Sequence, residues 1–373
     1  MKSEFYKSLL HKIMSSLPND YDDNYDAERF GAEKQPDTLT GRLYNTSLIS
    51  KRFYNKSNQI SLFKNADNLI NDPLFNQLED LYDMLSDEQS KDLLVQLVAF
   101  RLLGHKKVKL PLSTPEYFKT LAKCDDLLVQ KLDGNNLGKD NKTIFAVYNL
   151  APIGYDLKLT FGRAGIVTDF ILEQYKYKSK EKEISVRKGD VVIDCGGFWG
   201  DTALYFSSKA GSTGKVYTFE FIPGNLNFLK KNFADNPTYS ANIQLVPHPV
   251  WETSDVNVYY LDRGAASSVT MTPPKEEAQI IKSKSIDALV AEQGMDRVDY
   301  IKMDIEGAEP FALRGAEQTL RKYKPNLAIA IYHSLSDFVK IPEYLSSLGL
   351  GYKFYLGHFT IHEEETILYA TIH

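Results

Sequence analysis

Four polar side chains stand at or just after short apolar segments, where a parallel sheet would bring them together. They are Asp194, Glu220, Asp304 and His333. In open α/β sheets, ligands bind beyond the carboxyl ends of the strands. Carboxylates there can accept hydrogen bonds from hydroxyl and amino groups, and histidine is the commonest general base. We therefore expect one rim of a sheet to carry a binding site with acid–base groups.

Glycines follow the first of these acids. In VVIDCGGFWGDTAL, Asp194 lies at the end of the apolar segment, and Gly196, Gly197 and Gly200 lie in the turn before a helical pattern. Glycine lets a backbone approach a ligand closely and adopt positive φ. A ligand-binding turn and an ordinary strand-to-helix turn both fit this pattern.

Glu220 strengthens the binding interpretation. It lies at the end of the next apolar segment, 26 residues after Asp194. A carboxylate there can accept hydrogen bonds from both hydroxyls of a ribose, and such charge-assisted bonds contribute about 1.5–3 kcal/mol each. The glycine turn and Glu220 together predict a ligand that contains a nucleoside.

Charged residues crowd the segment YIKMDIEGAE. Lys302 and Asp304 point to the same side of a strand, because side chains repeat every two residues, so a Lys–Asp pair could form. His333 follows the next apolar segment and should face the same rim as Asp304. Glu306 and Glu309 also fit a second interpretation, in which they favour the N-terminus of the following helix through its dipole.

The part of the chain that carries these residues has the pattern of an α/β fold. From about residue 184, short apolar segments alternate with amphipathic helical patterns, which is typical of βαβ units. We predict strands at 191–195, 215–221, 243–246, 256–261, 298–304 and 327–332, and a closing strand pair at 351–359 and 365–372. The expected fold is a Rossmann-like, doubly wound, mostly parallel sheet with an antiparallel edge strand.

The upstream part is patterned differently. Residues 1–139 are predicted to form a mainly helical N-terminal region, because leucines recur at spacings of three and four between 74 and 100. Residues 140–183 are predicted to form a small β element and linker, with IFAVYNL and YDLKLTF as two strands around a turn. The charged run KYKSKEKE, at 176–183, is taken as the boundary to a domain at 184–373.

Composition restricts the partners. The chain has 373 residues with 44 Lys+Arg and 49 Asp+Glu, so 44 − 49 = −5, and the basic residues are scattered. Nucleic-acid binding is therefore not expected. The longest apolar runs, such as 93–100, are shorter than the roughly 20 residues that span a bilayer, so no transmembrane segment is expected. With two cysteines and no secretory signal pattern, the cytoplasm is the expected location.

Four stretches resemble the FkbM family of S-adenosylmethionine-dependent methyltransferases. They are DCGGFWGDT, VYTFEFIPGNLNFLKKN, VDYIKMDIEGAEPFALRGA and LAIAIYHSLSDFVKIPEYL, and the resemblance covers about residues 140–373. It implies a class I methyltransferase fold. It also implies O-methylation of a hydroxyl, for which we expect an acceptor that is a sugar, a glycan, a glycolipid or another small molecule.

Carried over by position, the resemblance implies a cofactor site for S-adenosylmethionine. Glu220 would hold the ribose, Phe221 would lie beside the adenine, and His248 is a weaker candidate at the adenine edge. Asp304 is expected to contact the cofactor as well as the acceptor. The residues implied around the methionine end are Asp194, Gly196, Gly197, Gly200, Asp201 and Thr202.

For catalysis, we hypothesise that His333 takes the proton of the acceptor hydroxyl. Asp304 would orient the acceptor or the base, and Lys302 would favour the developing oxyanion charge. Glu306 is a further catalytic candidate. A divalent metal, Mg²⁺ or Mn²⁺, held by Asp304, Glu306 or His333 is the mechanistic alternative.

Two other classes of function stay open. A nicotinamide-dependent oxidoreductase also combines a strand, glycines and a later acid, but it expects G-x-G-x-x-G, and Asp194 would crowd a pyrophosphate on this turn. A non-catalytic cofactor-binding scaffold, with the N-terminal region as its interaction module, also fits. Each of these possible functions is compatible with an oligomeric protein.

Overall fold

The computed structural model describes residues 3–30, 73–132, 145–262, 267–274 and 277–373. Residues 31–72 and 133–139 of the predicted helical region lie outside the described residues, as does the start of the predicted β element at 140–144.

A seven-stranded sheet forms the centre of the molecule, in the order β14-β15-β13-β12-β6-β7-β8. The pairs from β13 through β12, β6 and β7 to β8 are all parallel. The doubly wound, mostly parallel sheet predicted from the sequence is therefore confirmed. Its strands are β6 (Val191–Cys195), β7 (Lys215–Phe219), β8 (Ile243–Val246), β12 (Tyr300–Met303), β13 (Asn326–Ala330), β14 (Lys353–His358) and β15 (Thr366–Thr371).

The reversed strand lies one place in from the edge. β15 is antiparallel to both β13 and β14, so the outermost strand, β14, runs in the same direction as the central ones. All six residues of β15 are buried, whereas β14 begins with an exposed residue. The more apolar member of the closing pair thus takes the inner position, and the predicted antiparallel pairing at the edge of the sheet is confirmed.

Alternate residues of the strands pack on the two faces of the sheet. Ile193 and Ile301 lie in one hydrophobic cluster, and Val192 and Tyr300 lie in another. The first face is covered by α13 (Ile286–Glu292), α14 (Glu309–Arg314), α15 (Glu317–Tyr323) and α16 (Asp337–Ser347). The second is covered by α10 (Asp201–Ala210), α11 (Pro223–Asp235) and α12 (Pro237–Ser240).

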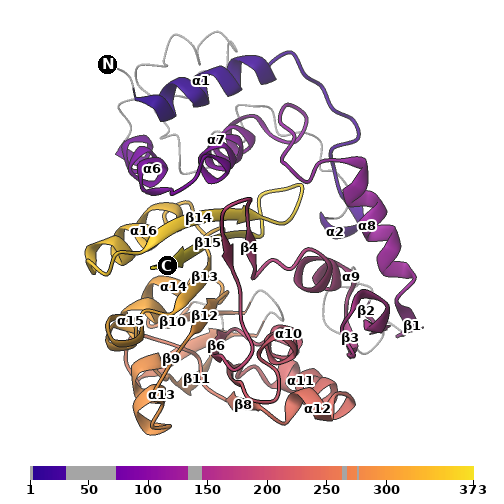
Figure 1. Cartoon of the computed structure of the whole chain (residues 1–373), viewed down its shortest axis with the longest axis vertical. Helices are drawn as coiled ribbons and strands as arrows, with labels where there is room; N and C mark the ends of the chain where they lie inside the picture. The colour runs from indigo at the N-terminus through magenta and orange to yellow at the C-terminus, as the bar shows by residue number, and fades with distance from the viewer. Residues whose placement is uncertain (1–2, 31–72, 133–144, 263–266, 275–276) are drawn as a thin grey trace.

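The N-terminal helices extend the first of these clusters. They are α1 (Glu4–Ser16), α6 (Pro73–Met84) and α7 (Glu88–Leu103), and Figure 1 shows them at the β14 end of the sheet. Phe5, Leu81 and Leu97 share a hydrophobic cluster with Leu356 of β14. Asp87 caps α7 by accepting from the Ser90 amide. The predicted helices are present, and they share a core with the sheet.

A small antiparallel β unit stands beside α10 and α11. It comprises β1 (Leu128–Lys131), β2 (Phe145–Asn149) and β3 (Lys158–Gly162), reached through α8 (Pro115–Asp125). The predicted pair of strands around a turn is therefore confirmed. After β3 the chain forms α9 (Arg163–Gly165) and a π-helix (Ile166–Ile171), and the π-helix is buried against α10.

The charged run at 176–183 forms a short hairpin between β4 (Tyr177–Lys178) and β5 (Glu183–Ile184). Tyr177 and Ile184 are buried in the same cluster as Tyr369 of β15. A hydrophobic cluster therefore spans the position at which the sequence places a domain boundary, and that boundary stays a prediction.

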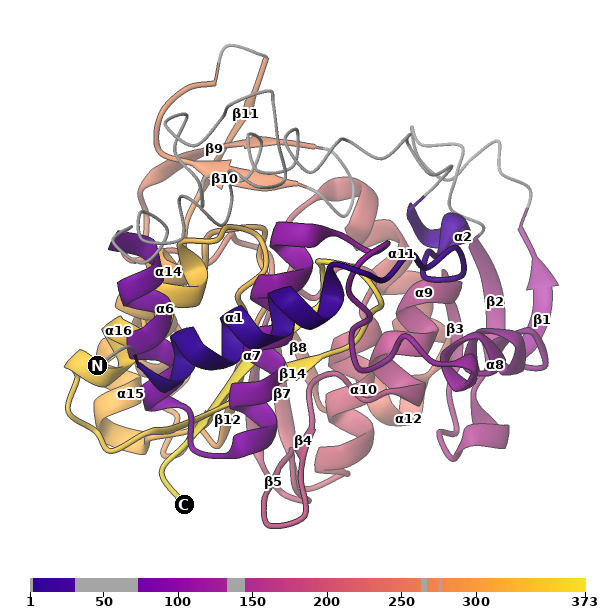
Figure 2. The ribbon, with the colours of Figure 1, turned by 90° about the horizontal axis from the view of Figure 1, so that it is seen from above.

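One predicted strand of the series belongs elsewhere. β9 (Asn257–Leu261) pairs with β10 (Ser268–Thr270) and β11 (Gln279–Lys282) in a separate antiparallel sheet. Figure 2 shows this sheet projecting from the body of the molecule. The apolar pattern at 256–261 identifies a strand, but it does not identify the partner.

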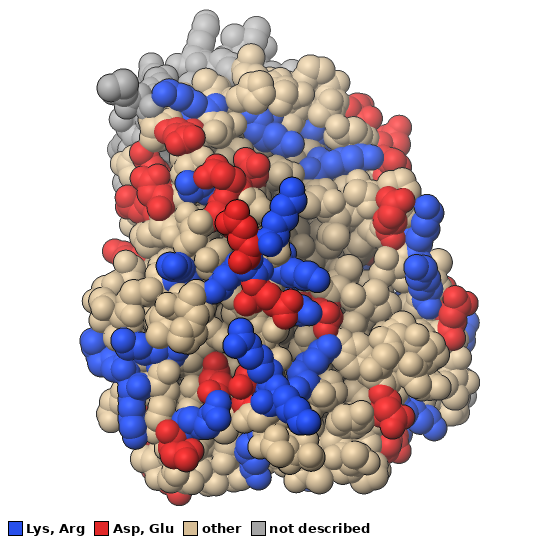
Figure 3. All heavy atoms as spheres, in the orientation of Figure 1, with Lys and Arg blue, Asp and Glu red and all other residues tan. Residues whose placement is uncertain are grey.

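The surface carries both signs of charge. On the face shown in Figure 3, Lys and Arg side chains are interspersed with Asp and Glu. Among the helices of the described residues, none has both the length and the apolar character needed to cross a membrane.

Candidate active site

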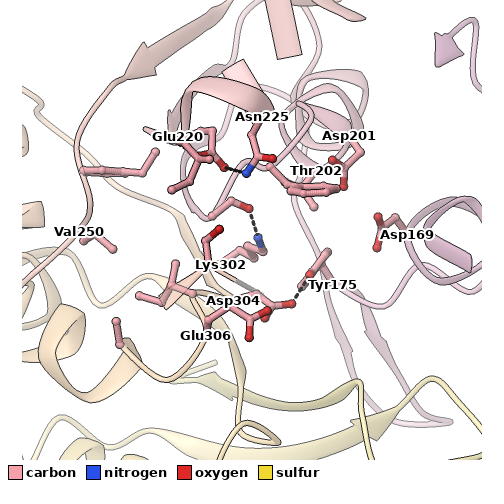
Figure 4. A pocket seen from close by; sticks show the side chains of 18 of the residues that line it. Asp169, Tyr175, Asp201, Thr202, Glu220, Asn225, Val250, Lys302, Asp304 and Glu306 are labelled. Carbon is pink, nitrogen blue, oxygen red and sulfur yellow. Dashed lines mark hydrogen bonds between the residues drawn. The ribbon is translucent and has the colours of Figure 1, made fainter. Parts of the chain in front are cut away.

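A cavity of about 290 Å³ opens at the carboxyl ends of β6, β7 and β12. It lies at the sheet rim predicted from the sequence, and Figure 4 shows the side chains that converge on it. Its walls come from the turn after β6, the segment after β7, the segment after β12, and the π-helix. The predicted residues that line it are Gly196, Asp201, Thr202, Glu220, Phe221, His248, Lys302, Asp304 and Glu306.

A row of polar side chains crosses the sheet beneath the cavity. Thr218, Asp194 and Lys302 are cross-strand neighbours on β7, β6 and β12. Asp194 is fully buried; its Oδ2 accepts from Thr218 at 2.8 Å and from Thr202 at 2.9 Å, and its Oδ1 lies 3.3 Å from Lys302 Nζ. Among the described residues, Asp194 is not part of the cavity wall. It therefore acts on the site through its neighbours.

Lys302 braces the glycine turn. Its ammonium donates to the carbonyls of Gly196 (2.7 Å) and Cys195 (3.3 Å), besides pairing with Asp194. Burial lowers its pKa, but the nearby carboxylates, Asp194 foremost, outweigh that effect and raise it. The predicted pairing of Lys302 with Asp304 is corrected, because Asp194 is the partner. With three partners for three N–H groups, Lys302 has no spare donor for an oxyanion.

The glycine turn needs two of its glycines for close packing. Gly196 has φ +95°, and a Cβ there would lie 2.1 Å from the Asp304 carbonyl oxygen. At Gly197, a Cβ would lie 2.1 Å from Thr218 Oγ1. Gly196 lines the cavity, whereas Gly197 and Gly200 lie behind the wall. The turn thus presents backbone rather than side chains to a ligand.

Glu220 lies directly after β7 with its carboxylate largely buried. Its Oε1 accepts from the amides of Phe221 and Ile222, both at 2.7 Å, and its Oε2 accepts from Asn225 at 3.3 Å. Burial raises the pKa of the carboxyl to about 7, against these donors. Oε2 retains capacity for a further donor, because a carboxylate oxygen has two lone pairs. His248 also lines this end, and its Nδ1 lies 2.9 Å from the Lys282 carbonyl oxygen.

Asp304 stands at the other end of the cavity between two tyrosines. Tyr175 donates to its Oδ2 at 3.0 Å, and Tyr332 donates to its Oδ1 at 3.2 Å. His333 Nε2 lies 3.4 Å from the same Oδ1. The predicted meeting of Asp304 and His333 at one rim is therefore confirmed.

His333 is surrounded by carboxylates. Its Nδ1 is 3.1 Å from Glu309 Oε1, and its Nε2 is 3.6 Å from Glu306 Oε2. Burial lowers its pKa, but the three neighbouring carboxylates prevail and raise it to about 10. His333 is thus a cation at neutral pH and is absent from the described cavity wall. These two features do not support the general-base role predicted for it.

Glu306 has the properties that His333 lacks. Its side chain lines the cavity and is 35% exposed. Burial, together with the charges of Asp304, Glu309 and Glu365, raises the pKa of its carboxyl to about 7, against the opposing effect of His333. Its backbone has φ +56°, a conformation rare for residues other than glycine and concentrated at functional sites. A carboxyl that titrates near 7 is suited to general acid–base work.

Several wall residues come from segments that sequence reasoning did not select. Arg29 lies in α2 (Ala27–Phe30), which follows α1 in the chain, Asp169 lies in the π-helix, and Glu365 immediately precedes β15. Arg29 Nη2 lies 2.5 Å from Glu365 Oε1. Burial raises the pKa of Glu365 to about 7, although Arg29 opposes this. Asp169 could have been noticed as the one acid within the apolar stretch GIVTDFIL; no local pattern indicates the Arg29–Glu365 pair.

Three residues have ligand atoms close enough together to hold a metal ion. Asp304, Glu309 and His333 offer such atoms within 4.8 Å of one another. This set differs from the predicted one, because Glu309 takes the place of Glu306.

A protein-family model identifies residues 185–354 as a methyltransferase FkbM domain. The match covers the parallel strands β6, β7, β8, β12 and β13, the glycine turn, and the side chains of Asp194, Glu220, Asp304 and His333. Together with the strand order, in which β15 lies reversed between β13 and β14, it gives the domain the class I, Rossmann-like methyltransferase fold expected from the sequence. No curated protein was found to match the chain.

Solved structures of methyltransferases are similar to parts of the chain. A methyltransferase FkbM from Methylobacillus flagellatus KT is 21% identical over 82% of this chain and 60% of its own, with a TM-score of 0.48. The chain thus spans 60% of the length of that relative. Aeropyrum pernix fibrillarin with bound S-adenosyl-L-methionine is 15% identical, covering 65% of this chain and 99% of its own, with a TM-score of 0.34.

Proposed function

Since the chain contains a methyltransferase FkbM domain, we propose that it transfers a methyl group from S-adenosylmethionine to a hydroxyl oxygen of a sugar, free or within a glycan or glycolipid. One observation carries this proposal. A single cavity joins the glycine turn and Glu220 at one end to Asp304 and Glu306 at the other.

The residues of the first end fit the cofactor. The backbone of Gly196 forms wall where a Cβ would collide, so that the ligand meets main chain. Glu220 Oε2 has one donor, Asn225, and would accept a ribose hydroxyl as another. Phe221, Ile222 and Val250 add apolar surface beside it, as an adenine requires. When bound, S-adenosylmethionine supplies an electrophilic methyl group on a sulfonium.

The second end fits an acceptor that must lose a proton. Glu306 is the residue that we propose as the base, because it lines the cavity and titrates near neutral pH. Asp304 is held by Tyr175 and Tyr332 and would orient the acceptor hydroxyl. His333 balances the charge of the surrounding carboxylates and so positions them.

The hydrogen-bonding groups of this wall support the proposed acceptor class. Carboxylates, tyrosine hydroxyls and the Gln174 amide are grouped there around Arg29. A sugar offers several hydroxyls that both donate and accept, and so can satisfy many such groups at once. Hence a polyhydroxyl acceptor is proposed in preference to an apolar one.

Calorimetric titration of the full chain with S-adenosylhomocysteine tests the cofactor. We expect binding that Glu220→Ala weakens at least tenfold, and that Glu181→Ala, at an exposed position, leaves within twofold. NAD in place of S-adenosylhomocysteine should give no signal. Binding of NAD alone would overturn the proposal in favour of an oxidoreductase.

Radiolabelled S-adenosylmethionine then tests the reaction. Label should move into glycan or glycolipid pools in the presence of the wild-type chain, and remain unused with Glu306→Gln. Cofactor binding without transfer to any such pool would favour a non-catalytic scaffold.

A further inference from the structure

We infer that Asp169 and Asp201 form a paired-carboxyl site that binds the ammonium group on the amino-acid arm of the cofactor. The inference rests on the proposed function, because it takes S-adenosylmethionine as the ligand. It adds Asp169, which lies in the π-helix before the matched domain.

Both carboxyls are built into the cavity wall. Each residue is 4% exposed, and both line the cavity. Asp201 begins α10 directly after the glycine turn, and its buried Oδ1 has no hydrogen-bond partner. Asp169 Oδ1 accepts from Gln174 at 2.6 Å and from Thr168 at 3.3 Å, which fixes its carboxyl opposite Asp201. A buried, unpartnered oxygen facing a cavity indicates a missing donor.

The charge around the pair favours a cationic ligand. The pair is faced by Lys302 of β12, but that ammonium is engaged by Asp194 and two carbonyls. The other ionisable groups that act on the pair or respond to it are Asp194, Tyr175 and Glu365. Burial raises the pKa of Asp201 to about 6 and raises that of Asp169 further above its ordinary value. Burial and the closeness of the two carboxyls therefore disfavour two negative charges on the pair, and a bound cation removes that penalty.

The position of Asp169 and Asp201 in the cavity indicates which part of the cofactor they bind. Figure 4 shows three polar corners: Glu220 and Asn225, then Asp304 and Glu306, then Asp169 with Asp201 and Thr202. A sulfonium in this cofactor carries three substituents, namely the nucleoside, the methyl group and the amino-acid arm. Glu220 takes the nucleoside, and the methyl group must face the acceptor beside Asp304 and Glu306. The third corner is left for the arm and its ammonium.

Two ligands separate this role from a structural one. S-Adenosylhomocysteine carries the amino-acid arm, whereas 5′-methylthioadenosine lacks it but keeps the nucleoside. We expect Asp169→Asn to lower the affinity for S-adenosylhomocysteine by about 10- to 100-fold, the range for a lost charged hydrogen bond. Its affinity for 5′-methylthioadenosine should stay within twofold of wild type. Asp156→Asn, at an exposed position close in sequence, should change neither.

Proton release gives a second readout. Titration of the wild type in buffers of different ionisation enthalpy should show proton release with S-adenosylhomocysteine and none with 5′-methylthioadenosine, because a bound cation lowers the raised pKa values of the pair. Asp169→Asn and Asp201→Asn should each abolish that release.

The outcomes separate the inference from the function on which it rests. Equal loss of both ligands in Asp169→Asn, or unchanged affinity for both, overturns the paired-carboxyl site while leaving the methyltransferase proposal intact. If neither ligand binds the wild type, both proposals fail together.

Discussion

The two ends of the cavity differ in how their charges are balanced. Beneath the glycine turn, Asp194 and Lys302 neutralise each other, and the remaining bonds of the pair go to Thr218, Thr202 and backbone carbonyls. At the opposite end, carboxylates outnumber cations, and the pKa values of Glu306 and Glu365 both rise to about 7. Satisfied charges hold a turn rigidly in place, whereas unsatisfied ones leave groups that can bind or react.

The two ends also differ in where their residues come from. Beneath the glycine turn, Thr218, Asp194 and Lys302 form a hydrogen-bonded row that we call the brace. These residues occupy neighbouring positions on three adjacent strands. The acidic end combines Arg29, the segment after β12 and Glu365, and the Arg29–Glu365 contact joins residues 336 positions apart. The first arrangement follows directly from strand pairing, whereas the second depends on the whole chain being folded.

If the acidic end is the reactive one, Glu306→Gln should have the largest effect. The amide cannot accept the acceptor's proton, so kcat should fall by about 10²- to 10⁴-fold, while the affinity for S-adenosylhomocysteine stays within twofold. Methyl transfer from radiolabelled cofactor to an acceptor found in the pools measures kcat. Glu343→Gln, on α16 away from the cavity wall, is the matched control.

The pH profile checks the same assignment. A base must be deprotonated to act, so activity should rise with pH and level off above about 7, where Glu306 is ionised. Activity that is flat between pH 5.5 and 8 in the wild type would speak against Glu306, whatever the variant does.

A substitution in the brace should lower the stability of the protein rather than act on its activity alone. Lys302→Met leaves Asp194 buried without its cation, which typically costs about 3–5 kcal/mol of unfolding free energy. Urea unfolding of the full chain measures this loss, and Lys230→Met, at an exposed position, should change stability by less than about 0.5 kcal/mol. A stable Lys302→Met protein that has lost only activity would show that the two ends do not differ in the way described.

The same contrast explains what sequence reasoning could reach. The strands at 191–195 and 243–246 were predicted at their observed bounds. For 191–195 the reason is its apolar run, which indicates a buried strand whatever its partners. Lys302 was placed on the correct face, but its partner was missed, since pairing depends on which strand lies alongside. β6 brings Asp194 next to it.

Less of the acidic end could be predicted from the sequence. The meeting of His333 with Asp304 follows from two adjacent parallel strands, and it was predicted. The charge of His333 depends on Glu309, whose direction is set by the start of α14. Asp169 and Arg29 reach the cavity through packing of segments far from the motif. The sequence motifs therefore identified Glu220, Asp304 and Glu306. They missed Asp169, Arg29 and Glu365, which reach the cavity from outside the motifs.

Arg29 tests whether the N-terminal region belongs to the acceptor end. Arg29→Gln removes the charge that faces Glu365 and one wall group, so KM for the acceptor should rise about tenfold, as expected for one charge-assisted hydrogen bond. Affinity for S-adenosylhomocysteine should change less than twofold. Lys106→Gln, which breaks an exposed pair with Asp22, is the control and should change neither. A parallel loss of cofactor affinity would mean that Arg29 serves both ends.

The smallest effect is expected from removing divalent metal. Asp304, Glu309 and His333 could serve as ligands, but both nitrogens of His333 already face carboxylate oxygens, at 3.1 and 3.4 Å, and its pKa near 10 makes it the cation of the cluster. Treatment with EDTA followed by dialysis should therefore leave methyl transfer within twofold. Added Mg²⁺ or Mn²⁺ should not increase it. Loss of activity that Mn²⁺ restores would instead mean that His333 releases its proton to solvent and binds the metal through a ring nitrogen, so that a metal cation balances the carboxylates of the acidic end as Lys302 balances Asp194.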